Sequence, residues 1–480
     1  MRRLGLRLTL ADVCFFGWHA LAMSWVTLTI TLRYMYVWAR VKLLRCGLSQ
    51  EQWQQVHSAV ARRFVSAAIR RKGGLIKVGQ FLSARADILP RESITILSRL
   101  QDRVDPAPFE WVKTIIGHEL GERAAELVDL EKECLAAASF GQVHRAKLCD
   151  GRCVVVKVQH RRIERSLRID LAILRLAFGL FDWLLPRLGL LAVFREIRRA
   201  TRNELDYHKE ADNCRRVAAI FAGDERVVIP TVIEALSTRQ VLVLEYIDGI
   251  KVTDVTSIKA AGIDPREVAQ LLIEVYCYQI YVAGFFHADP HPGNLFVLSG
   301  PCLGIVDFGM AKQIPEELLK SLRRGIYAIL ARDMEELLAA MVQMGLIVPT
   351  EEALVQPFLE RLAARLQVGD SREFRCLQHE LLAQGHKLLA ELRSLLRLLD
   401  SPRLPEDLVL YGRAISLLQG LVAQLAPDVE IFTLMLPYML RFLGGGAEPL
   451  RRHRPLRSER RGQCDTLVEA QAIKGPQARE

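Results

Sequence analysis

The most constraining feature of this sequence is the run His-Ala-Asp-Pro-His-Pro-Gly-Asn at 287–294, which is followed by Asp307-Phe308-Gly309. The separation of Asp289 from Asp307 leaves room for a short hairpin. Residues 293–297 and 302–306 have the apolar character of its two strands, and 298–301 have the composition of its turn. A polar loop that held these residues by chance would not also have this order and this strand context.

The chemistry of phosphate transfer explains why these residue types occur at this spacing. An aspartate has to sit beside the attacking hydroxyl or water, and an asparagine a few residues later has to reach a Mg²⁺ ion. A second aspartate, at the next strand-to-loop junction, has to hold the metal against the β- and γ-phosphates. This is the layout of a kinase catalytic loop. It predicts Asp289 as the catalytic acid, with Asn294 and Asp307 as catalytic residues that also bind Mg²⁺.

An alanine-rich segment at 136–143 has the register of a kinase phosphate loop, G-x-G-x-x-G-x-V, with Ala136 and Ala138 in place of the first two glycines. Alanine restricts the close approach of backbone to phosphate that glycine allows. We therefore expect nucleotide to bind in an altered phosphate pose. The residues expected to bind nucleotide here are Ala136, Ala137, Ala138, Ser139, Phe140, Gly141 and Val143.

A lysine on an apolar strand follows this loop. The turn Asp150-Gly151 predicts a hairpin that leads into 154–158, where Lys157 would contact the α- and β-phosphates and pair with a glutamate on a helix. The nearest candidate is a long polar helix expected at 196–219. Its carboxylates are Glu204, Asp206 and Glu210.

The remainder of the expected catalytic region is a hinge and a helical lobe. A strand at 241–245 leads into a loop, so Glu245 and Tyr246 are expected beside the adenine. A helix at 265–283 leads into the catalytic loop. After Asp307-Phe308-Gly309 there is no A-P-E and no room for an activation segment, which argues against an ordinary protein kinase. Residues 316–443 are helical by pattern, and a basic tail follows.

The N-terminal residues favour contact with a membrane. Residues 13–32 form an apolar run about long enough to span a bilayer as a helix, and basic and aromatic residues flank it. Three interpretations stay open: a spanning helix, a helix that lies in the interface, and a helix packed on the protein. An amphipathic helix is expected at 49–71.

The composition indicates which classes of binding partner to expect. Net charge is +10, and residues 1–80 hold thirteen Lys and Arg against two Asp and Glu. Such charge beside an apolar segment favours an anionic membrane surface or lipid as partner. Nucleic acid is not expected, because no recognition motif accompanies the charge. The ten cysteines form no C-x-x-C pair, which fits a reducing compartment and does not favour a zinc site.

Taken together, these motifs resemble the UbiB/AarF/ADCK family of atypical kinase-like proteins over about residues 65–440. Lys77-x-Gly79-Gln80 and Glu204-x-Asp206 are the most specific part of the resemblance, since ordinary kinases have neither. The resemblance implies that a helix carrying Lys77 and Gln80 lies over the active site and has a regulatory role. It also implies that Lys77 and Gln80 reach Glu204 and Asp206, and that Lys157 pairs with Glu210.

The family resemblance further implies ATP or ADP binding with Mg²⁺, membrane association and a role in ubiquinone or other isoprenoid-quinone lipid metabolism, with ATPase activity better supported than transfer to a protein. A quinone-biosynthesis complex is a further implied partner. The implied location is a membrane with the catalytic domain facing the cytosol, the inner membrane in a bacterium or an organelle in a eukaryote. Residues 400–480 depart from the bacterial UbiB pattern because they hold no pair of apolar spans.

The expected architecture is α+β, a two-lobed protein-kinase-like fold with an N-terminal helical extension and a largely helical C-terminal lobe. The expected divisions are a membrane-associating segment at 1–48, the helical extension at 49–130, the N-terminal lobe at 131–249, the C-terminal lobe at 250–445 and a basic tail at 446–480. Two other functions stay open. One is a small-molecule phosphotransferase resembling aminoglycoside or choline kinases, and the other is a non-catalytic nucleotide-sensing scaffold of a lipid-modifying complex.

Overall fold

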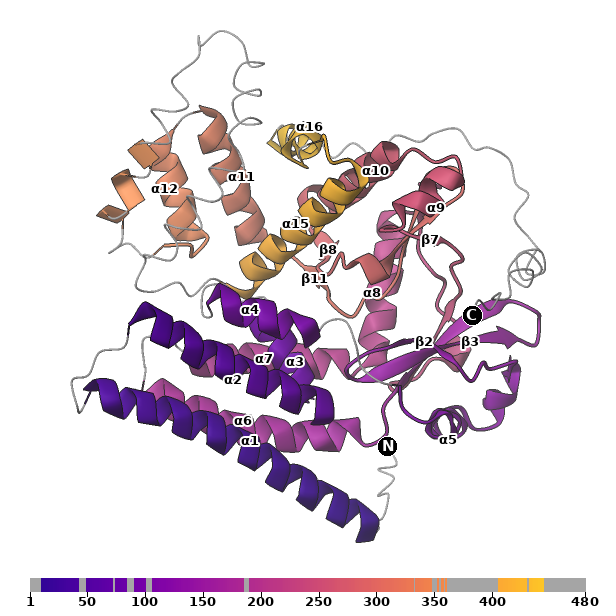
Figure 1. The fold of residues 1–480 in the computed structure, drawn as a ribbon. Coiled ribbons are helices and arrows are strands. Elements are labelled where there is room, and N and C mark those ends of the chain that lie inside the picture. Colours follow the sequence, from indigo (N-terminus) through magenta and orange to yellow (C-terminus); the bar gives the residue numbers. More distant parts are fainter. Residues whose placement is uncertain are drawn as a thin grey trace, which may run out of the picture.

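The computed structural model describes residues 10–42, 49–71, 74–83, 90–100, 106–184, 190–331, 333–347, 352–353, 355–357, 359–360, 405–429 and 431–443. These residues form the two lobes of a kinase-like fold, and a body of helices packs beside them (Figure 1). The predicted α+β class, with a helical extension and a largely helical C-terminal lobe, is confirmed. The predicted basic tail at 446–480 lies outside the described residues.

The N-terminal lobe is an antiparallel sheet with one helix on its outer face. In strand β4 the side chains alternate, so that Val154, Val156 and Val158 are buried against helix α5 while Lys157 points to the opposite face. This alternation aims the lysine at the cleft between the lobes. The elements are α5 (Phe109–Leu120), β1 (Leu127–Val128), β2 (Cys134–Ala137), β3 (Gly141–Leu148), β4 (Cys153–Gln159) and β6 (Val241–Glu245). The predicted β3–β4 hairpin is confirmed, with Gly151 at a φ of 87°.

The C-terminal lobe surrounds a buried helix, α10 (Pro265–Cys277), which continues as a π-helical turn at Tyr278–Ala283. The hairpin predicted after the catalytic loop is confirmed, with β9 paired to β10. β11 pairs with β8, and α11 begins three residues after β11 ends, which leaves no room for an activation segment. The other elements are β5 (Val227–Val228), β7 (Ile250–Lys251), α9 (Val255–Ala260), β8 (Phe285–His287), β9 (Leu295–Leu298), β10 (Cys302–Ile305), β11 (Ala311–Gln313), α11 (Glu316–Ala331), α12 (Met334–Gln343), α15 (Glu406–Leu425) and α16 (Ile431–Leu443).

The third body is a stack of helices from two separate parts of the chain. The N-terminal helices are α1 (Leu10–Lys42), α2 (Gln50–Arg71), α3 (Gly74–Ser83) and α4 (Arg91–Leu97), and α6 (Ile163–Leu184) with α7 (Leu190–Glu204) joins them from within the N-terminal lobe (Figure 1). Ser49 caps α2, because its hydroxyl accepts from the Gln52 amide at 3.2 Å while the Gln52 side chain accepts from the Ser49 amide at 3.0 Å.

The single polar helix predicted at 196–219 was wrong. The chain forms two helices instead, α7 and α8 (Tyr207–Ile220), with a break at Leu205 and Asp206. Leu205 is buried, and Asp206 has extended backbone and caps α8 by accepting from the His208 amide at 3.2 Å. Because both helices are polar, the sequence pattern did not distinguish this cap from a residue within one helix. The break changes the direction of the chain, so that α8 packs against the sheet.

Two helices in the described part of the chain are long and apolar enough to cross a membrane, judged by length and composition alone: Cys14–Val41 within α1 and Asp407–Leu425 within α15. Helix α15 places Leu418, Leu421 and Val422 in the core of the C-terminal lobe, and 28% of its apolar window is buried. In α1 only 17% of the apolar window is buried.

One buried carboxylate joins three of these helices. Asp170 on α6 is fully buried, and its two oxygens meet the Nε2 atom of His19 on α1 at 2.6 Å and the Gly74 amide of α3 at 3.1 Å. A β-carbon at Gly74 would lie 2.7 Å from the Asp170 carboxylate, so only glycine allows this approach. Asp170 therefore holds the first residue of α3 and also holds α1 in its position against α6.

We expect Asp170→Asn to lower the free energy of unfolding by about 1–3 kcal/mol, because a buried charge-assisted pair is lost. Chemical denaturation followed by circular dichroism measures this change. Glu164→Gln on the same helix removes an exposed i,i+4 partner of Arg168 and should change stability by less than about 0.5 kcal/mol. Equal effects of the two variants would contradict a special role for Asp170.

Candidate functional site

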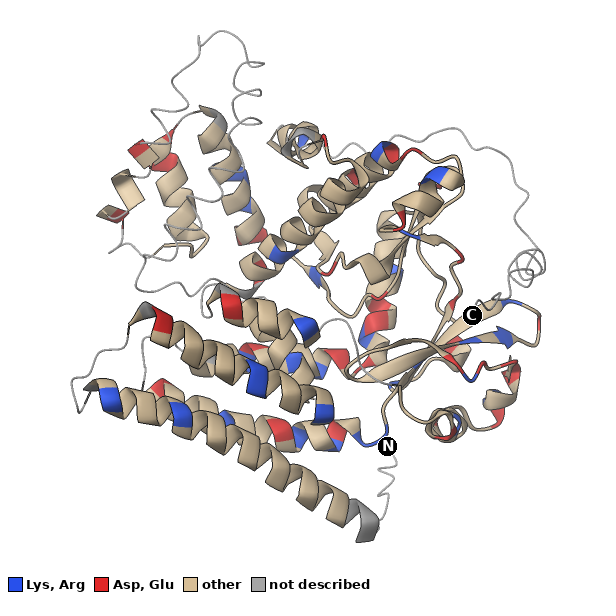
Figure 2. Cartoon of the chain, viewed as in Figure 1, with Lys and Arg blue, Asp and Glu red and all other residues tan. Residues whose placement is uncertain are grey.

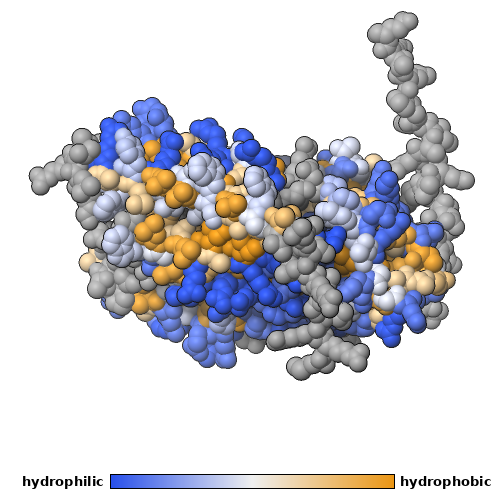
Figure 3. All heavy atoms as spheres, turned by 90° about the horizontal axis from the view of Figure 1, so that it is seen from below, coloured by the Kyte–Doolittle hydropathy of each residue, from blue (hydrophilic) through white to orange (hydrophobic). Residues whose placement is uncertain are grey.

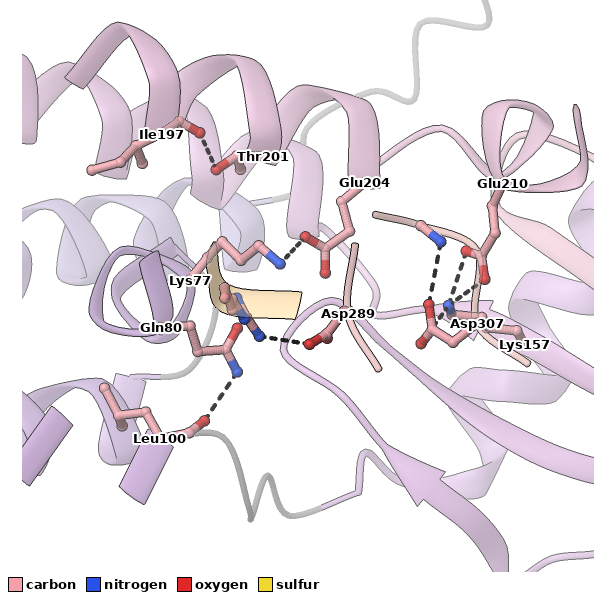
Figure 4. A network of polar contacts seen from close by, with 12 residues as sticks. Lys77, Gln80, Leu100, Lys157, Ile197, Thr201, Glu204, Glu210, Asp289 and Asp307 are labelled. Atoms are coloured by element: carbon pink, nitrogen blue, oxygen red, sulfur yellow. Dashed lines mark hydrogen bonds and ion pairs between the residues drawn. The ribbon is translucent and has the colours of Figure 1, made fainter. Parts of the chain in front are cut away.

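A buried ion pair links the sheet to helix α8. The Lys157 ammonium lies 2.7 and 2.9 Å from the two carboxylate oxygens of Glu210 (Figure 4). Asp206 caps the start of α8, and this places Glu210 in the first turn of α8, where it is 4% exposed. The Lys157 ammonium also lies 3.4 Å from Asp307, so one lysine holds two carboxylates.

The charges of these three residues are interdependent. Burial alone lowers the pKa of the Lys157 ammonium, but the carboxylates of Asp307 and Glu210 outweigh it, so this pKa lies well above its ordinary value. Burial raises the pKa of Glu210, and Lys157 opposes that rise. Partial burial also raises the pKa of Asp307, but Lys157 and then His287 overcome it and hold that pKa below its ordinary value. The lysine is therefore cationic and Asp307 anionic at neutral pH.

A buried histidine fixes the backbone that carries Asp307. The ring of His287 is fully buried and contacts the Asp307 carbonyl oxygen at 2.6 Å and the Tyr276 hydroxyl at 3.2 Å. The His287 amide donates to the side chain of Gln279 at 2.8 Å. Asp307 has a φ of 61°, a conformation that costs energy for a residue with a β-carbon and persists only where its surroundings hold it.

The catalytic loop presents Asp289 and Asn294 to the same space. The side-chain amide of Asn294 donates to the backbone carbonyl oxygen of Asp289 at 3.3 Å, which links the two ends of the loop. The Asp289 carboxylate accepts a 2.8 Å hydrogen bond from the Arg413 guanidinium of α15. In this conformation the Arg413 guanidinium is hydrogen-bonded to the Asp289 carboxylate, which is the group expected to accept a proton from the nucleophile.

Helix α3 lies across the front of this site. Lys77 forms an ion pair with Glu204, the last residue of α7 (Figure 4). Gln80 instead donates to the Leu100 carbonyl at 3.0 Å, and Asp206 is the cap of α8. Of the four residues expected to meet here, the structure thus brings Lys77 and Glu204 together and directs Gln80 and Asp206 to the backbone.

A cavity of about 220 Å³ lies where these elements converge. Helix α3, the alanine-rich loop, α7, the catalytic loop and α15 enclose it. The expected site residues on its wall are Lys77, Gln80, Ala137, Ala138, Ser139, Glu204, Asp289, Asn294 and Asp307. Lys157 and Glu210 lie behind Asp307.

Several expected nucleotide contacts lie elsewhere. Phe140 is 2% exposed and packs in a core cluster with Leu167 and Leu205. Gly141 lies under Tyr207, whose hydroxyl would be 2.5 Å from a β-carbon there. The residues away from the cavity wall are Ala136, Phe140, Gly141, Val143, Glu245, Tyr246 and Asp206. Glu245 is the last residue of β6, and the amide of the following Tyr246 donates to the Cys153 carbonyl of β4 at 3.0 Å.

Sequence reasoning missed the contribution of α15. Val409, Leu410 and Arg413 line the cavity, although they lie more than 100 positions after Asp289. Arg413 is the one charge between Leu408 and Leu425, so it stands alone in an apolar helical stretch. A charge in such a setting needs a buried partner, and this was the available signal. His291 of the catalytic loop and Glu196 of α7 also line the cavity without having been singled out.

The donor atoms on the cavity wall fit a magnesium ion held partly by phosphate. Mg²⁺ prefers oxygen ligands and takes one or two protein side chains together with substrate oxygens and water. Asp307 presents a carboxylate that is 45% exposed, and Asn294 retains its side-chain oxygen when its amide group donates to the loop. Within the described ranges no group of three His, Cys, Asp or Glu residues could hold a metal by itself. The described side chains on this wall would therefore hold Mg²⁺ together with phosphate oxygens and water, and not by themselves.

A strand lysine paired with a helix glutamate, a catalytic-loop aspartate and a D-F-G aspartate together form the arrangement of a kinase-like site. The comparison with known families agrees. A model of the ABC1 atypical kinase-like domain matches residues 99–341, and the chain belongs to this family. The resemblance to UbiB/AarF/ADCK proteins is therefore confirmed.

Relatives from three kinds of organism match most of the chain. Protein ACTIVITY OF BC1 COMPLEX KINASE 8, chloroplastic, of Arabidopsis thaliana is 33% identical over 441 residues, 84% of this chain and 57% of that protein. Probable protein kinase UbiB of Marinobacter nauticus is 32% identical over 372 residues, 76% of this chain and 66% of that protein. AarF domain-containing protein kinase 1 of Xenopus tropicalis is 33% identical over 297 residues, 61% of this chain and 57% of that protein. The chain thus spans less than two thirds of the length of each.

We expect Asp307→Asn to abolish the Mg²⁺-dependent part of nucleotide binding, because the amide removes the only carboxylate of the predicted ligand pair. Isothermal titration with ADP, with and without Mg²⁺, measures this part. Asp212→Asn on α8 neutralises an exposed carboxylate outside the cavity and should leave the affinity unchanged. An unchanged affinity in Asp307→Asn would contradict the assignment of Asp307 to the metal.

We expect Ala138→Gly to change the preference between ATP and ADP. The Ala138 amide donates to the Gly141 carbonyl at 2.7 Å, and His160 contacts the Ala138 carbonyl at 3.2 Å, so this turn is held in one conformation. Glycine costs ordered backbone about 0.5–1 kcal/mol relative to alanine. Where only one of the two nucleotides needs this turn ordered, that cost changes the ratio of the ATP and ADP affinities by about two- to fivefold. If neither affinity moves in a direct titration, Ala138 does not contact phosphate.

Proposed function

We propose that this protein is a membrane-associated atypical kinase or ATPase that binds Mg-ATP and ADP and supports ubiquinone or other isoprenoid-lipid metabolism. The observation that carries the proposal is the convergence on one cavity of Asp289, Asn294 and Asp307, with the Lys157–Glu210 pair directly behind them.

Each side chain has a role that follows from its position. Lys157, fixed by Glu210, contacts phosphate oxygens and offsets their charge. Asp307 and Asn294 hold Mg²⁺, which when bound supplies positive charge against the phosphates. Asp289 accepts the proton of a water or hydroxyl nucleophile once Arg413 has moved from its carboxylate.

The closed front of the site favours a small nucleophile over a peptide. Helix α3 is tied to α7 by the Lys77–Glu204 pair, and Phe81 of α3 lines the same cavity. A cavity of about 220 Å³ behind this helix has room for phosphates and a hydroxyl. Water or a lipid hydroxyl therefore fits this conformation better than a folded protein substrate.

Relatives support the metabolic part of the proposal. Proteins named UbiB and ACTIVITY OF BC1 COMPLEX KINASE match more than three quarters of this chain, and family membership favours a ubiquinone-related role. A quinone-biosynthesis complex is the partner that this role suggests, and a membrane is the corresponding location, with the catalytic domain on the cytosolic side.

The surface of α1 supports membrane association. Its exposed large side chains recur every three or four residues and thus form one stripe along the helix, opposite the face that carries His19 and Met23. Figure 2 shows few charges along α1, and in Figure 3 a hydrophobic band crosses the underside of the molecule between hydrophilic borders. Such a helix suits the plane of the bilayer interface better than a span, because its other face is occupied by protein. The stripe is Phe15, Trp18, Leu21, Trp25, Leu28, Leu32, Met35 and Tyr36.

A nucleotide-sensing scaffold is the second candidate. The Asp289–Arg413 bond favours it, since a carboxylate paired with a guanidinium is not free to accept a proton. A soluble small-molecule phosphotransferase is a further alternative, and the closed front of the site does not favour it.

We expect the purified protein to release phosphate from ATP faster with anionic liposomes than without them, and Asp307→Asn to release none. A phosphate-release assay measures both. Absence of turnover under every lipid condition, with MgADP still raising the melting temperature of the unaltered protein, would favour the scaffold.

We expect the double variant Trp18→Ser, Trp25→Ser to lose most of its flotation with vesicles of phosphatidylcholine and phosphatidylglycerol, because two exposed aromatic anchors are removed. Tyr327→Ser is the matched control, since Tyr327 is 61% exposed on α11, away from α1. Equal flotation of the double variant and the unaltered protein would contradict the role of α1.

A further inference from the structure

The helical body contains a second cavity, of about 190 Å³, between α1, α2, α3 and α6. Ile30 of α1, Val60 and Phe64 of α2, and Ala177 and Phe178 of α6 form its sides. Most of these side chains are only partly buried, so the cavity communicates with the outside along the seam between the helices.

The chemistry of this cavity selects an apolar ligand. Its lining is almost entirely hydrocarbon, and two of its few polar side chains satisfy each other, with the Tyr34 hydroxyl 2.9 Å from the His57 ring. An apolar cavity of about 150 Å³ stays dry and accepts a benzene-sized group. The space therefore suits several carbons of a hydrocarbon chain and offers little to water or to a polar metabolite.

Helix α3 is a wall of both cavities. Leu75, Val78 and Leu82 follow the three- and four-residue spacing of one helix face and line the apolar cavity. Lys77, Gln80 and Phe81 lie on another face and line the predicted nucleotide site. A ligand in the apolar cavity would therefore contact the same short helix that carries the Lys77–Glu204 pair.

The apolar cavity adjoins the surface that we assign to the membrane. Helix α1 forms one side of it through Val26, Ile30 and Tyr34, while the apolar stripe of the same helix is exposed. The helices that form its sides, α1, α2 and α6, carry exposed basic residues, which suit the anionic headgroups from which a chain would come. These are Arg33, Arg40, Arg62, Arg63, Arg70 and Arg175.

We propose that this cavity binds one hydrocarbon chain of a membrane lipid and that the bound chain sets the position of α3 over the nucleotide site. The choice of a membrane lipid as occupant rests on the proposed membrane association. Binding of the two ligands is reciprocal. If the hydrocarbon chain changes the affinity for nucleotide by some factor, nucleotide changes the affinity for the hydrocarbon chain by the same factor.

Photolabelling of the full chain tests this proposal. Two probes are used, a phosphatidylcholine with a diazirine in one acyl chain and an isoprenoid alcohol with a diazirine near its end. Each is supplied both in phosphatidylcholine–phosphatidylglycerol vesicles and as a cyclodextrin complex without vesicles, and adducts are located by mass spectrometry. We expect adducts on the α2 and α6 walls, around Val60 and Phe178, from at least one probe in both settings. The probe that labels more strongly identifies an acyl or an isoprenoid chain.

Filling the cavity provides the decisive comparison. Ala177→Phe places a ring in the cavity and should lower wall labelling at least about tenfold. Ala172→Phe, at an exposed position five residues earlier on the same helix, should leave it unchanged. Val60→Phe fills the cavity from the opposite wall if Ala177→Phe fails to fold. Nucleotide affinity should respond to the probe in the unaltered protein and not in the filled variants.

Two results would overturn the proposal: adducts confined to the exposed stripe of α1, or wall labelling that survives both filling variants. Wall labelling from cyclodextrin together with failure of the protein to float with vesicles would leave the chain site standing and refute the proposed membrane association. Flotation with vesicles but no labelling of the cavity wall would support the proposed membrane association and refute the hydrocarbon-chain site.

Discussion

The buried pair between Lys157 and Glu210 is the interaction on which the rest of the site depends. Removing two charges from water is costly, and two short hydrogen bonds between the partners offset that cost. The nearby Asp307 carboxylate stabilises the lysine cation but opposes ionisation of Glu210. The pair therefore requires β4, α8 and the D-F-G segment in one arrangement. That arrangement sets the distance between the lobes, and the catalytic loop is positioned against it through His287 and the Asp307 carbonyl.

Helix α3 gives this kinase-like site its distinctive character. It has only ten residues, yet it is held at its start by Asp170, at its middle by the Lys77–Glu204 pair and at Gln80 by the Leu100 carbonyl. Leu75, Val78 and Leu82 face the apolar cavity, and Lys77, Gln80 and Phe81 face the other one. A single packed helix therefore connects α1, which we propose to lie on the membrane, to the proposed nucleotide site.

The sequence predicted most of the fold because its motifs are local. The loop at 287–294, the hairpin after it and the strand of Lys157 are each specified by a few adjacent residues, and the structure has all three. Local motifs did not specify long-range pairings in the same way. The pairs Lys77–Glu204 and Lys157–Glu210 were expected only through the family resemblance. Arg413 meets Asp289 across 124 positions, and nothing near either residue specifies the other. The break at Asp206 was missed because an aspartate within a polar stretch reads equally well as a solvated helical residue and as a cap.

The triple contact at Asp170 also bears on the order in which the chain can fold during synthesis. Gly74 and His19 are made 96 and 151 positions before the carboxylate that holds them. Helices α1 to α4 therefore leave the ribosome without the partner that completes their core, and their apolar faces stay open until α6 has been translated. During that interval the hydrophobic stripe of α1 is available to a membrane or a chaperone before the nucleotide site exists.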